Sequence, residues 1–545
     1  MAGDPLAFFT LDHGTASTAA ALVAPVAGRF RLLAADAQPA GLPAEALLTR
    51  LVDRAVAHDE AALPDPASWR TWARLEVVTR PAPRVVLAGV DEAGLAAVSA
   101  AATGAGWRIA GRLRADRLDA VEATSACLGS EVDLLVAAGP AQPSSHERGA
   151  LADATALLRA ACDRRPGVTA LLAGGAAEAA EGWTGPRLVL GPAAAPAGPA
   201  EPTPLGELLA ALAVEVAARA ARAADPAQAT AADGRRAFDV GVVSLAAILE
   251  QQVEGVDVGT AGGLRVAAGR HGREARLHLA DGGLVPPALL DDDRLVDSVV
   301  GWSTLRDDAF LQRDRLRNLA LWPWRDASGE GAHLRIAAAR AALARLDAAW
   351  SSRPGPHAAG IGRGPELVVV SGGCFSLMPP GVAELVVLDT MRWPGGVAVA
   401  HDHARLLAPL GSIEDEGDRR RLLVDLLDDL LLPLGSVMVV PGSRAARHPG
   451  RVRIGGPGPG RDLPLVPGAV QVVPVAPGTT ALVELDAREA GWLGPRARRV
   501  ALEVGGGLGG LLIDTRDVPL HLPDRADRRR DLLEAWERPL WPTGR

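Results

Sequence analysis

The sequence predicts an α/β protein of two similar halves followed by a β-rich C-terminal module. Each half opens with short apolar runs separated by a Gly-containing turn, which is the pattern of a β-meander. In the first half, continuous apolar runs then alternate with helix-like stretches, which is typical of a parallel sheet covered by helices on both faces. Beyond about residue 442 the pattern changes to short β-like runs between Gly and Pro turns.

The length of 545 residues is too great for one hydrophobic core, so two or three domains are expected. We place the first half at residues 1–240, the second half at residues 241–441 and the C-terminal module at residues 442–545.

The expected strands of the first half fall into a meander and a set of buried runs. The meander strands are Leu6–Leu11, Ala19–Ala24 and Arg29–Ala34, and the buried runs are Val85–Val90, Val132–Ala138 and Val168–Ala173. The second half is expected to contain helices at Val243–Gln251 and Leu334–Trp350 and strands at Val256–Gly259, Leu264–Ala268, His271–Leu279, Glu366–Val370, Leu385–Leu388 and Val397–Ala400.

The composition excludes several classes of protein. The chain contains no lysine, so the Walker A phosphate loop and the lysine Schiff base of pyridoxal phosphate enzymes are excluded. The net charge of −8 gives no reason to expect nucleic acid, because a binding face for nucleic acid carries a basic excess. The three cysteines are odd in number and lie far apart, which is typical of neither a disulfide framework nor a zinc site.

The sequence also gives no sign of a membrane segment. The first residues lack the basic region of a signal peptide. The long apolar stretch Leu422–Val440 contains Asp425, Asp428 and Asp429, whose charges are too costly for a membrane span. A cytoplasmic protein with no membrane partner is therefore expected.

Three short motifs predict a nucleotide site, and their order matters more than any one of them. The first is Asp-x-Gly-Thr-x-Ser-Thr at residues 12–18, in the first expected hairpin turn. The second is Asp-x-Gly-Thr-x-Gly-Gly at residues 257–263, in a similar turn. The third is Gly372-Gly373, at the end of a buried strand. Each motif alone is more typical of a plain turn or loop.

Each motif suits one part of a nucleotide. Small residues in a turn let backbone N–H groups approach a polyphosphate, and an Asp at each strand end can hold hydrated Mg²⁺. Hydroxyl groups can donate to phosphate oxygens, and a Gly pair lets adenosine pack against the backbone. The predicted ligands are ATP and Mg²⁺, with Asp12 and Asp257 on the metal. The predicted cofactor-binding residues are Asp12, Gly14, Thr15, Ser17, Thr18, Asp257, Gly259, Thr260, Gly372 and Gly373.

This order of motifs resembles the superfamily of actin, heat-shock chaperones and sugar kinases, and within it the MutL/GlmL family found with glutamate mutase. The resemblance spans nearly the whole chain, with loose motifs. The segments that carry it are Phe8–Thr15, Val85–Val90, Val132–Gly139, Leu171–Gly175, Val256–Gly259, Val370–Gly373, Leu406–Ser412 and Gly507–Arg516.

The resemblance implies two actin-like (RNase H-like) ATPase domains with the β-rich C-terminal module. It also implies a chaperone-like accessory protein, or reactivase, that activates an adenosylcobalamin-dependent mutase and uses ATP to change the angle between two domains. The chain departs from the family in its second turn, where Gly262-Gly263-Leu264 stands in place of Thr-Thr-Asp, and in its first turn, which lacks a Lys.

Three functions stay open at this point. The departures support ATP binding more strongly than hydrolysis, so a catalytically inactive pseudo-ATPase scaffold for a protein partner is the alternative to an ATPase. A small-molecule kinase of the same superfamily ranks third. The sequence assigns no catalytic residue, no individual partner and no oligomeric state.

Overall fold

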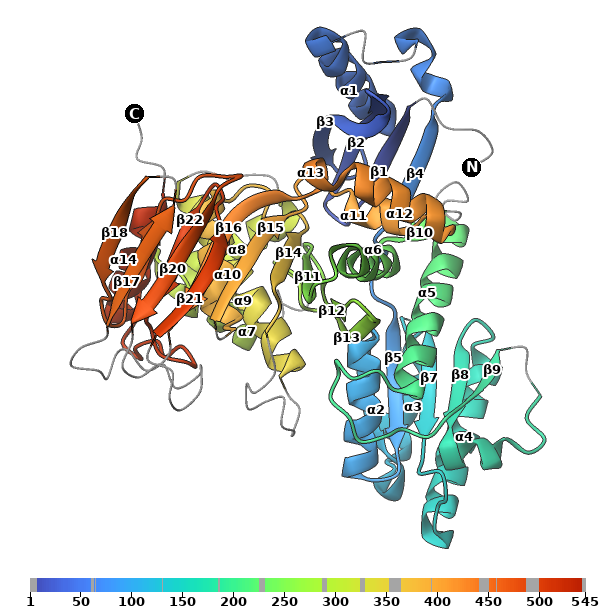
Figure 1. The fold of residues 1–545 in the computed structure, drawn as a ribbon. Coiled ribbons are helices and arrows are strands. Elements are labelled where there is room, and N and C mark those ends of the chain that lie inside the picture. Colours follow the sequence, from blue (N-terminus) through green and yellow to red (C-terminus); the bar gives the residue numbers. More distant parts are fainter. Residues whose placement is uncertain are drawn as a thin grey trace.

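The structure is a computed structural model that describes residues 7–59, 63, 65–129, 131–184, 187–224, 231–286, 292–323, 329–351, 364–393, 395–440, 450–456, 458–486 and 499–541. In these ranges the chain forms four β-sheets with helices packed on them (Figure 1).

The sheet of the first half begins with the predicted meander. Strands β1, β2 and β3 pair antiparallel, and β4 and β10 continue the sheet in parallel on the other side of β1. The order is β10-β4-β1-β2-β3. Helix α1 (Ala44–Asp59) covers one face with Leu47, Leu48 and Leu51. The strands are β1 (Phe8–His13), β2 (Ser17–Val26), β3 (Arg29–Pro39), β4 (Ala73–Val78) and β10 (Ala232–Asp233).

The second half repeats this arrangement strand for strand. Its first three strands form an antiparallel meander, and the next two add in parallel, in the order β13-β12-β11-β14-β15. Two sheets with this order and these directions make up the actin-like fold, so the predicted fold class is confirmed. The strands are β11 (Val253–Val258), β12 (Gly263–Gly269), β13 (Gly272–Leu279), β14 (Leu367–Ser371) and β15 (Gly395–His401).

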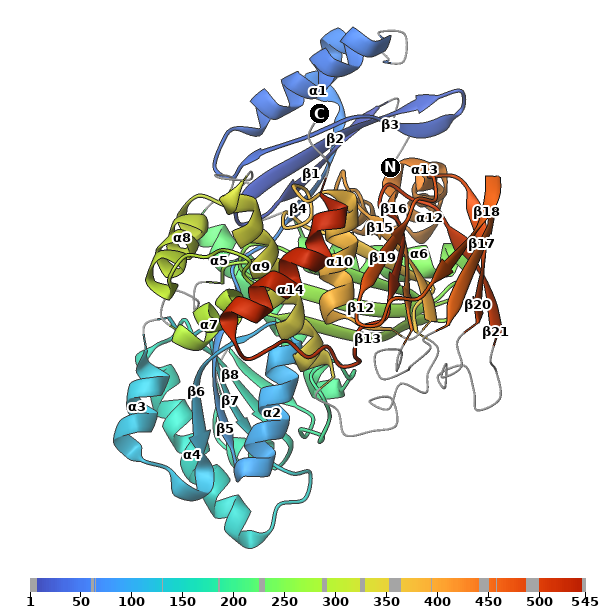
Figure 2. The ribbon, with the colours of Figure 1, turned by 90° about the vertical axis from the view of Figure 1, so that its left-hand side faces the viewer.

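The C-terminal part of the chain contributes to two sheets. Strands β16 (Leu432–Val439), β22 (Gly510–Asp514) and β19 (Val470–Val473) extend the sheet of the second half beyond β15. Buried side chains such as Met438, Val483 and Leu511 join that sheet to a four-stranded one, which faces it in Figure 2. The second sheet contains β17 (Arg451–Gly456), β18 (Gly458–Pro464), β20 (Thr480–Asp486) and β21 (Arg499–Gly505).

Of the two predicted domain boundaries, only the first falls within the described residues. The boundary between residues 441 and 442 lies outside the described residues. The boundary between residues 240 and 241 falls inside helix α6 (Gly234–Leu249).

A separate parallel sheet is inserted between β4 and β10, and we call residues 84–224 the inserted domain. It lies below the first half in Figure 1. Its strand order is β6-β5-β7-β8-β9, with helices α2 and α5 packed on one face and α3 and α4 on the other. The elements are β5 (Arg84–Gly89), α2 (Glu92–Gly104), β6 (Arg108–Arg114), α3 (Ala120–Leu128), β7 (Leu134–Ala138), α4 (Ser145–Arg164), β8 (Thr169–Ala173), β9 (Leu188–Gly191) and α5 (Pro204–Ala224).

Two helices cross between the halves. Helix α6 follows β10 of the first half but packs on β11, β12 and β13, whereas α11 (Leu407–Gly411) follows β15 and contacts β1 and β4. Their backbones touch at two glycines. A Cβ atom at Gly411 would lie 2.0 Å from the carbonyl oxygen of Ala237, and one at Gly241 would lie 2.5 Å from that of Leu407. Only glycine fits this crossing without a backbone shift.

The remaining helices lie mainly on the second half, and one of them corrects a prediction. The run Leu385–Leu388 was predicted as a strand and is part of helix α10. All residues from Gly381 to Asp389 are buried, so the helix shows no polar face and its sequence lacks helical periodicity. The helices are α7 (Asp293–Gly301), α8 (Ala309–Leu321), α9 (Glu330–Trp350), α10 (Pro380–Thr390), α12 (Glu416–Asp425), α13 (Leu427–Leu430) and α14 (Ala526–Glu537).

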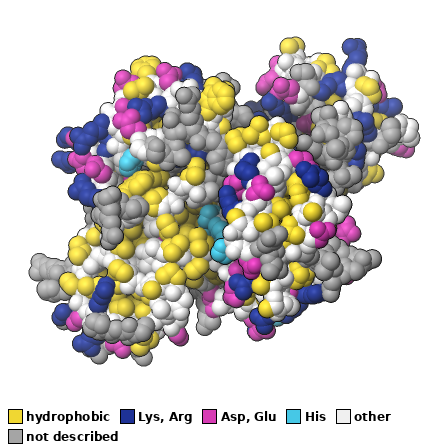
Figure 3. All heavy atoms as spheres, turned by 90° about the horizontal axis from the view of Figure 1, so that it is seen from above, with side chains coloured by type: hydrophobic (Ala, Val, Ile, Leu, Met, Phe, Trp, Pro, Cys, Tyr) yellow, Lys and Arg dark blue, Asp and Glu magenta, His cyan; other side chains and the backbone are white. Residues whose placement is uncertain are grey.

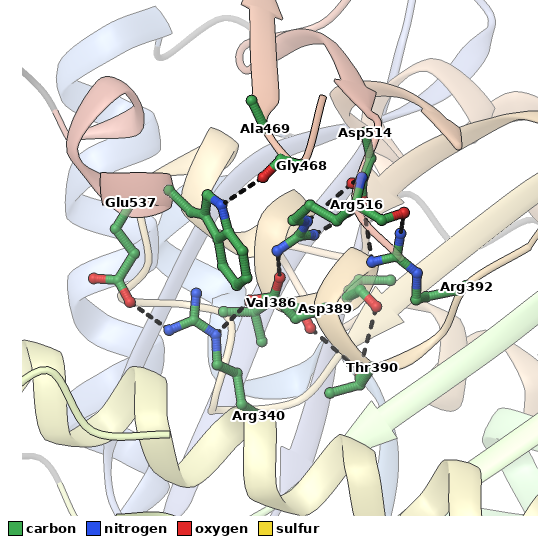
Figure 4. A network of polar contacts seen from close by, with 12 residues as sticks. Arg340, Val386, Asp389, Thr390, Arg392, Gly468, Ala469, Asp514, Arg516 and Glu537 are labelled. Carbon is green, nitrogen blue, oxygen red and sulfur yellow. Dashed lines mark hydrogen bonds and ion pairs between the residues drawn. The ribbon is translucent and has the colours of Figure 1, made fainter. Parts of the chain in front are cut away.

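A buried network of charges joins four of these elements (Figure 4). The guanidinium of Arg340 on α9 donates to Asp389 on α10 at 2.6 Å and also pairs with Glu537 on α14. Asp389 accepts a second bond from Arg516 at 2.5 Å, and Arg516 pairs with Asp514 of β22 at 2.9 Å. All five side chains are at most 3% exposed. The network therefore fixes the C-terminal helix to the second half.

The surface seen from above is uneven in character. Hydrophobic side chains gather in the lower left of Figure 3, while charged side chains are more frequent elsewhere on this face. Within the described ranges, no helix combines the length and apolar character that a membrane span requires.

The helix crossing leads to a prediction about Gly411. The substitution Gly411→Ala places a methyl group against backbone and should lower the free energy of unfolding by about 1–3 kcal/mol. Gly149→Ala is the matched control, because Gly149 lies exposed in α4 with nothing within 4 Å of the added atom. Better helix propensity should make the control neutral or stabilising by up to about 1 kcal/mol. Calorimetric melting measures both, and equal effects would contradict the crossing.

The charge network leads to a second prediction. Asp389→Ala leaves Arg340 and Arg516 buried without their shared carboxylate, which should cost about 3–5 kcal/mol of stability. The control Glu534→Ala removes an exposed pair with Arg538 and should change stability by less than about 0.5 kcal/mol. Denaturant unfolding compares the two variants. A loss for Asp389→Ala no larger than that of the control would show that the network does not stabilise the fold.

Candidate functional site

The first predicted motif forms the turn between β1 and β2. Asp12 pairs with Ala19 near the end of the hairpin, and the N–H of Gly14 donates to the carbonyl oxygen of Ser17 at 2.8 Å. This bond closes a tight loop. A Cβ atom at Gly14 would lie only 3.0 Å from the carbonyl oxygen of Ser17, so glycine suits this position. The loop directs Asp12 toward the second half.

The second motif forms the same turn in the second half. Asp257 pairs with Leu264, and the N–H of Gly259 donates to the carbonyl oxygen of Gly262 at 3.0 Å. The register and the closing bond therefore match those of the first hairpin. The two Asp-x-Gly motifs are structural equivalents, as their position in two similar predicted turns indicated.

Both turns face one cavity of about 50 Å³, which we call the hairpin cavity. The residues that line it include nine of the ten predicted cofactor-binding residues: Asp12, Gly14, Thr15, Ser17, Asp257, Gly259, Thr260, Gly372 and Gly373. The tenth, Thr18, is buried, and its hydroxyl lies 3.3 Å from Nδ1 of His13. The lining also includes Thr79, Arg235 and Arg405, which the sequence did not predict.

Close packing leaves little room for larger side chains at the glycine pair after β14. Gly372 has a φ of +93°, and a Cβ atom there would lie 2.4 Å from the carbonyl oxygen of Val258. A Cβ atom at Gly373 would lie 3.0 Å from a guanidinium nitrogen of Arg405. Glycine therefore lets the end of β14 close against the second hairpin. Contact with adenosine stays a prediction.

The two carboxylates share one electrostatic environment. Burial raises the pKa of Asp12, although Arg405 and His13 oppose the shift. Burial also raises the pKa of Asp257 to about 6, and the charge of Asp12 adds to that effect. A divalent cation between two such carboxylates would relieve their repulsion and desolvation.

These carboxylates fit Mg²⁺, which binds one or two carboxylates and keeps several waters. Within the described residues, no group of three or more His, Cys, Asp or Glu side chains gathers as a metal site. In the hairpin cavity, Mg²⁺ would be held by Asp12 and Asp257, with water and phosphate oxygens as its other ligands.

Arg405 enters the hairpin cavity from the loop after β15. Its side chain is 7% exposed and its backbone adopts a φ of +52°. Nη1 donates to the hydroxyl of Ser17 at 2.9 Å and lies 3.7 Å from a carboxylate oxygen of Asp12. A cation of the second half therefore bridges to the hairpin of the first half.

The loop that carries Arg405 is fixed by a buried carboxylate. Asp402 accepts bonds from the N–H groups of Leu406 at 2.8 Å and Leu407 at 3.2 Å, and from the hydroxyl of Ser371 at 3.2 Å. Burial raises the pKa of Asp402 to about 7, although these bonds oppose the shift. The bonds hold the backbone of the loop and so place Arg405.

Arg235 is the second cation of the hairpin cavity. It lies in the first turn of α6, whose N-cap Asp233 accepts from the N–H of Arg236. Burial lowers the pKa of Arg235, and in the described part of the chain its side chain makes no hydrogen bond and no ion pair within 4 Å. A Cβ atom at Gly262 would lie 3.6 Å from its Nη2. This unpaired guanidinium beside the second turn suits an anion such as phosphate.

Comparison with known proteins gives no family assignment, because no family model and no curated protein matches the chain. A similar solved structure is component A of (R)-2-hydroxyglutaryl-CoA dehydratase from Acidaminococcus fermentans, with 7% identity and a TM-score of 0.28 over 75% of this chain and 96% of that one. Nucleotide-free acetone carboxylase shows 10% identity and a TM-score of 0.27, over 98% of this chain and 84% of the matched chain. The PilM-PilN type IV pilus biogenesis complex shows 14% identity and a TM-score of 0.24, over 78% of this chain and 98% of the matched chain.

At identities and TM-scores this low, the similarities carry no argument about this chain. The fold class rests on the strand order of the two halves. Membership of the MutL/GlmL family stays a prediction.

The geometry of Arg405 leads to a prediction about anion binding. Arg405→Gln removes one cation from the hairpin cavity and should weaken the binding of pyrophosphate about tenfold, since a charge-assisted bond is lost. Arg420→Gln is the matched control, because Arg420 is exposed on α12. Calorimetric titration measures both variants. An unchanged dissociation constant for Arg405→Gln would show that the bridge to Ser17 is purely structural.

Proposed function

We propose that the chain binds Mg-ATP between its two actin-like halves. The observation that supports this proposal is the pair of Asp-x-Gly hairpins, which share one register and face one cavity. Two arginines line the same cavity, so its charge suits a metal-bound polyphosphate.

Each part of the site has a role in this proposal. Asp12 and Asp257 hold Mg²⁺, which neutralises phosphate charge when bound. Arg235 and Arg405 bind phosphate oxygens. The backbone at Gly14, Thr15, Gly259 and Thr260 donates to phosphates, Ser17 and Thr18 supply hydroxyl groups, and Gly372 and Gly373 lie against adenosine.

Binding requires a change in the hairpin cavity. Its volume of about 50 Å³ is smaller than a nucleotide needs, and Arg405 bridges it through Ser17 and Asp12. In the proposal, the guanidinium of Arg405 leaves Ser17 for a phosphate oxygen as the halves separate. The crossing of α6 and α11 is the hinge for this motion, because each helix belongs to one half and packs on the other.

We further propose that nucleotide-dependent motion serves a partner protein. The resemblance to the MutL/GlmL family favours an adenosylcobalamin-dependent mutase, for which this chain would act as a chaperone-like activator. The test is whether Mg-ATP and this protein together restore activity to an inactivated mutase of that class. No effect on the mutase would exclude this partner and leave nucleotide binding untouched.

A pseudo-ATPase scaffold is the second candidate. The bridge from Arg405 to Ser17 and Asp12 favours it, since this bridge joins the loop after β15 of the second half to the first hairpin. The second turn favours it too, because Gly262 and Gly263 offer no side-chain contacts to phosphate.

Titration with Mg-ATP tests the proposed site. Asp12→Asn and Asp257→Asn each remove a metal ligand and should weaken binding at least about tenfold. Omission of Mg²⁺ should have a similar effect on the unsubstituted protein. Asp53→Asn, on the exposed side of α1, is the control and should leave the affinity unchanged.

Two outcomes separate the candidates. Release of phosphate from bound ATP, lost in both site variants, would establish an ATPase, whereas tight binding without turnover would establish the scaffold. Well-folded protein that binds no Mg-ATP would overturn the proposed nucleotide site and leave a scaffold for a protein partner as the remaining candidate.

A further inference from the structure

A second and larger cavity lies next to the hairpin cavity. It has a volume of about 310 Å³ and lies where α5 of the inserted domain meets α6 and the edge strand β13, and we call it the junction cavity. Arg235 and Leu264 line both cavities, so the two are neighbours. Its volume lies at the lower end of the range for small-molecule sites, which is about 300–1,000 Å³.

One wall of the junction cavity is apolar and smooth. It is built from small side chains of α5, including Ala210, Val214 and Ala217, which are half-buried there. Side chains of this size leave room beside the helix and contribute only methyl groups to the wall. This wall suits the apolar body of a ligand.

The rest of the lining, which includes Glu207 at the start of α5, carries charges that are largely paired with one another. Arg273 of β13 donates to Asp239 at 2.8 Å and to Glu207 at 2.8 Å. Arg276 makes longer bonds to the same two carboxylates, at 3.3 Å and 3.4 Å. Because these four charges balance, they do not by themselves call for a charged ligand.

Arg235, unlike Arg273 and Arg276, is not paired with a carboxylate among the described residues. Its guanidinium has no hydrogen bond and no ion pair within 4 Å in the ranges that the structure describes. Arg235 is half-buried and lines the junction cavity, and Asp233 and Asp257 act on it only over longer distances. An acid group in the junction cavity would give its guanidinium a direct, charge-assisted partner.

Two buried polar atoms on this side also lack partners in the described chain: Nε2 of His278 and Oδ1 of Asp239. His278 is 9% exposed and Asp239 is 3% exposed, and both line the junction cavity. The ring of His278 packs against Gly106 of the inserted domain, where a Cβ atom would lie 1.7 Å from Nδ1. Burial and the nearby Arg235 and Arg276 lower the pKa of His278 well below its usual value, so the ring is neutral.

Buried polar atoms without partners are rare in native proteins, and a ligand or ordered water normally satisfies them. A ligand with a polar substituent can donate to Asp239 and share a hydrogen bond with His278. The two atoms therefore add a second point of recognition, separate from Arg235.

We propose that the junction cavity binds a small organic anion whose acid group lies at Arg235 and whose apolar body lies along α5. The acid group is a carboxylate or a phosphate monoester, because both have the oxygens that a guanidinium binds. This site shares Arg235 with the proposed Mg-ATP site, so the two ligands would compete for that guanidinium, but the rest of its lining is different and it does not require nucleotide.

Ligand-observed NMR on the full chain, without nucleotide, tests the proposal with three probes. Phenylacetate carries a carboxylate, phenyl phosphate carries a phosphate, and 2-phenylethanol is neutral with the same ring. Both anions, or one of them, should bind at least about tenfold more tightly than the neutral probe, since only they pair with Arg235. Binding by a single anion would assign the acid group.

Two substitutions locate the probes. Val214→Trp fills the junction cavity from α5 and should abolish binding, whereas Ala220→Trp, on the exposed side of the same helix, should preserve it. Arg235→Gln should weaken the anions about tenfold and leave 2-phenylethanol unchanged. Circular dichroism verifies that each variant is folded, and Ala217→Trp, which lines the junction cavity but not the hairpin cavity, replaces Val214→Trp if that variant does not fold.

Three results would overturn the proposal. They are no binding of either anion by folded protein, equal binding of the neutral probe, and anion binding that survives both Val214→Trp and Arg235→Gln. Because no nucleotide is present, failure here says nothing about Mg-ATP binding, and failure of Mg-ATP binding leaves this test intact.

Discussion

The contact between α6 and α11 is the constraint on which the site depends. Gly241 and Gly411 let the two helices touch at the backbone, and each helix packs on the sheet of the other half. Each half therefore runs from its fifth strand through an arginine into a crossing helix: β10 leads to Arg235 and α6, and β15 leads to Arg405 and α11. The crossing that joins the halves thus also brings two cations to the place where the two Asp-x-Gly turns meet.

Much of the hairpin cavity could be predicted because its motifs are local. Asp12 and Asp257 stand at fixed positions in tight turns, and a tight turn requires particular residues nearby in the sequence. Arg235 and Arg405 could not be found in this way. Their place depends on which strands lie side by side, and arginine is abundant throughout the chain, with 57 basic residues and no lysine. The one available signal was that Arg405 closely follows the predicted strand Val397–Ala400.

The same reasoning explains the fold-level differences. Two alike halves follow from repeated local patterns, but the insertion of β22 between β16 and β19 depends on pairing between distant residues. The buried helix α10 shows no polar face from which a helical period could be read.

Arginine plays different parts in the charge network and in the hairpin cavity. Arg340 and Arg516 are each ion-paired with carboxylates inside the second half, where they fix α9, α10 and α14, whereas Arg235 makes no ion pair within 4 Å among the described residues and lies between two cavities.

The inserted domain makes a second connection across the hinge. It is continuous with the first half through β4, and it contacts the second half through the pair Arg108–Asp281 at 3.0 Å and the bond from the N–H of Arg276 to the oxygen of Ala200 at 3.2 Å. Rotation of the halves must either carry the inserted domain along with β13 or break these contacts. The stiffness of the molecule against opening therefore depends not only on the helix crossing but also on the interface between the inserted domain and β13, where single residues can adjust it.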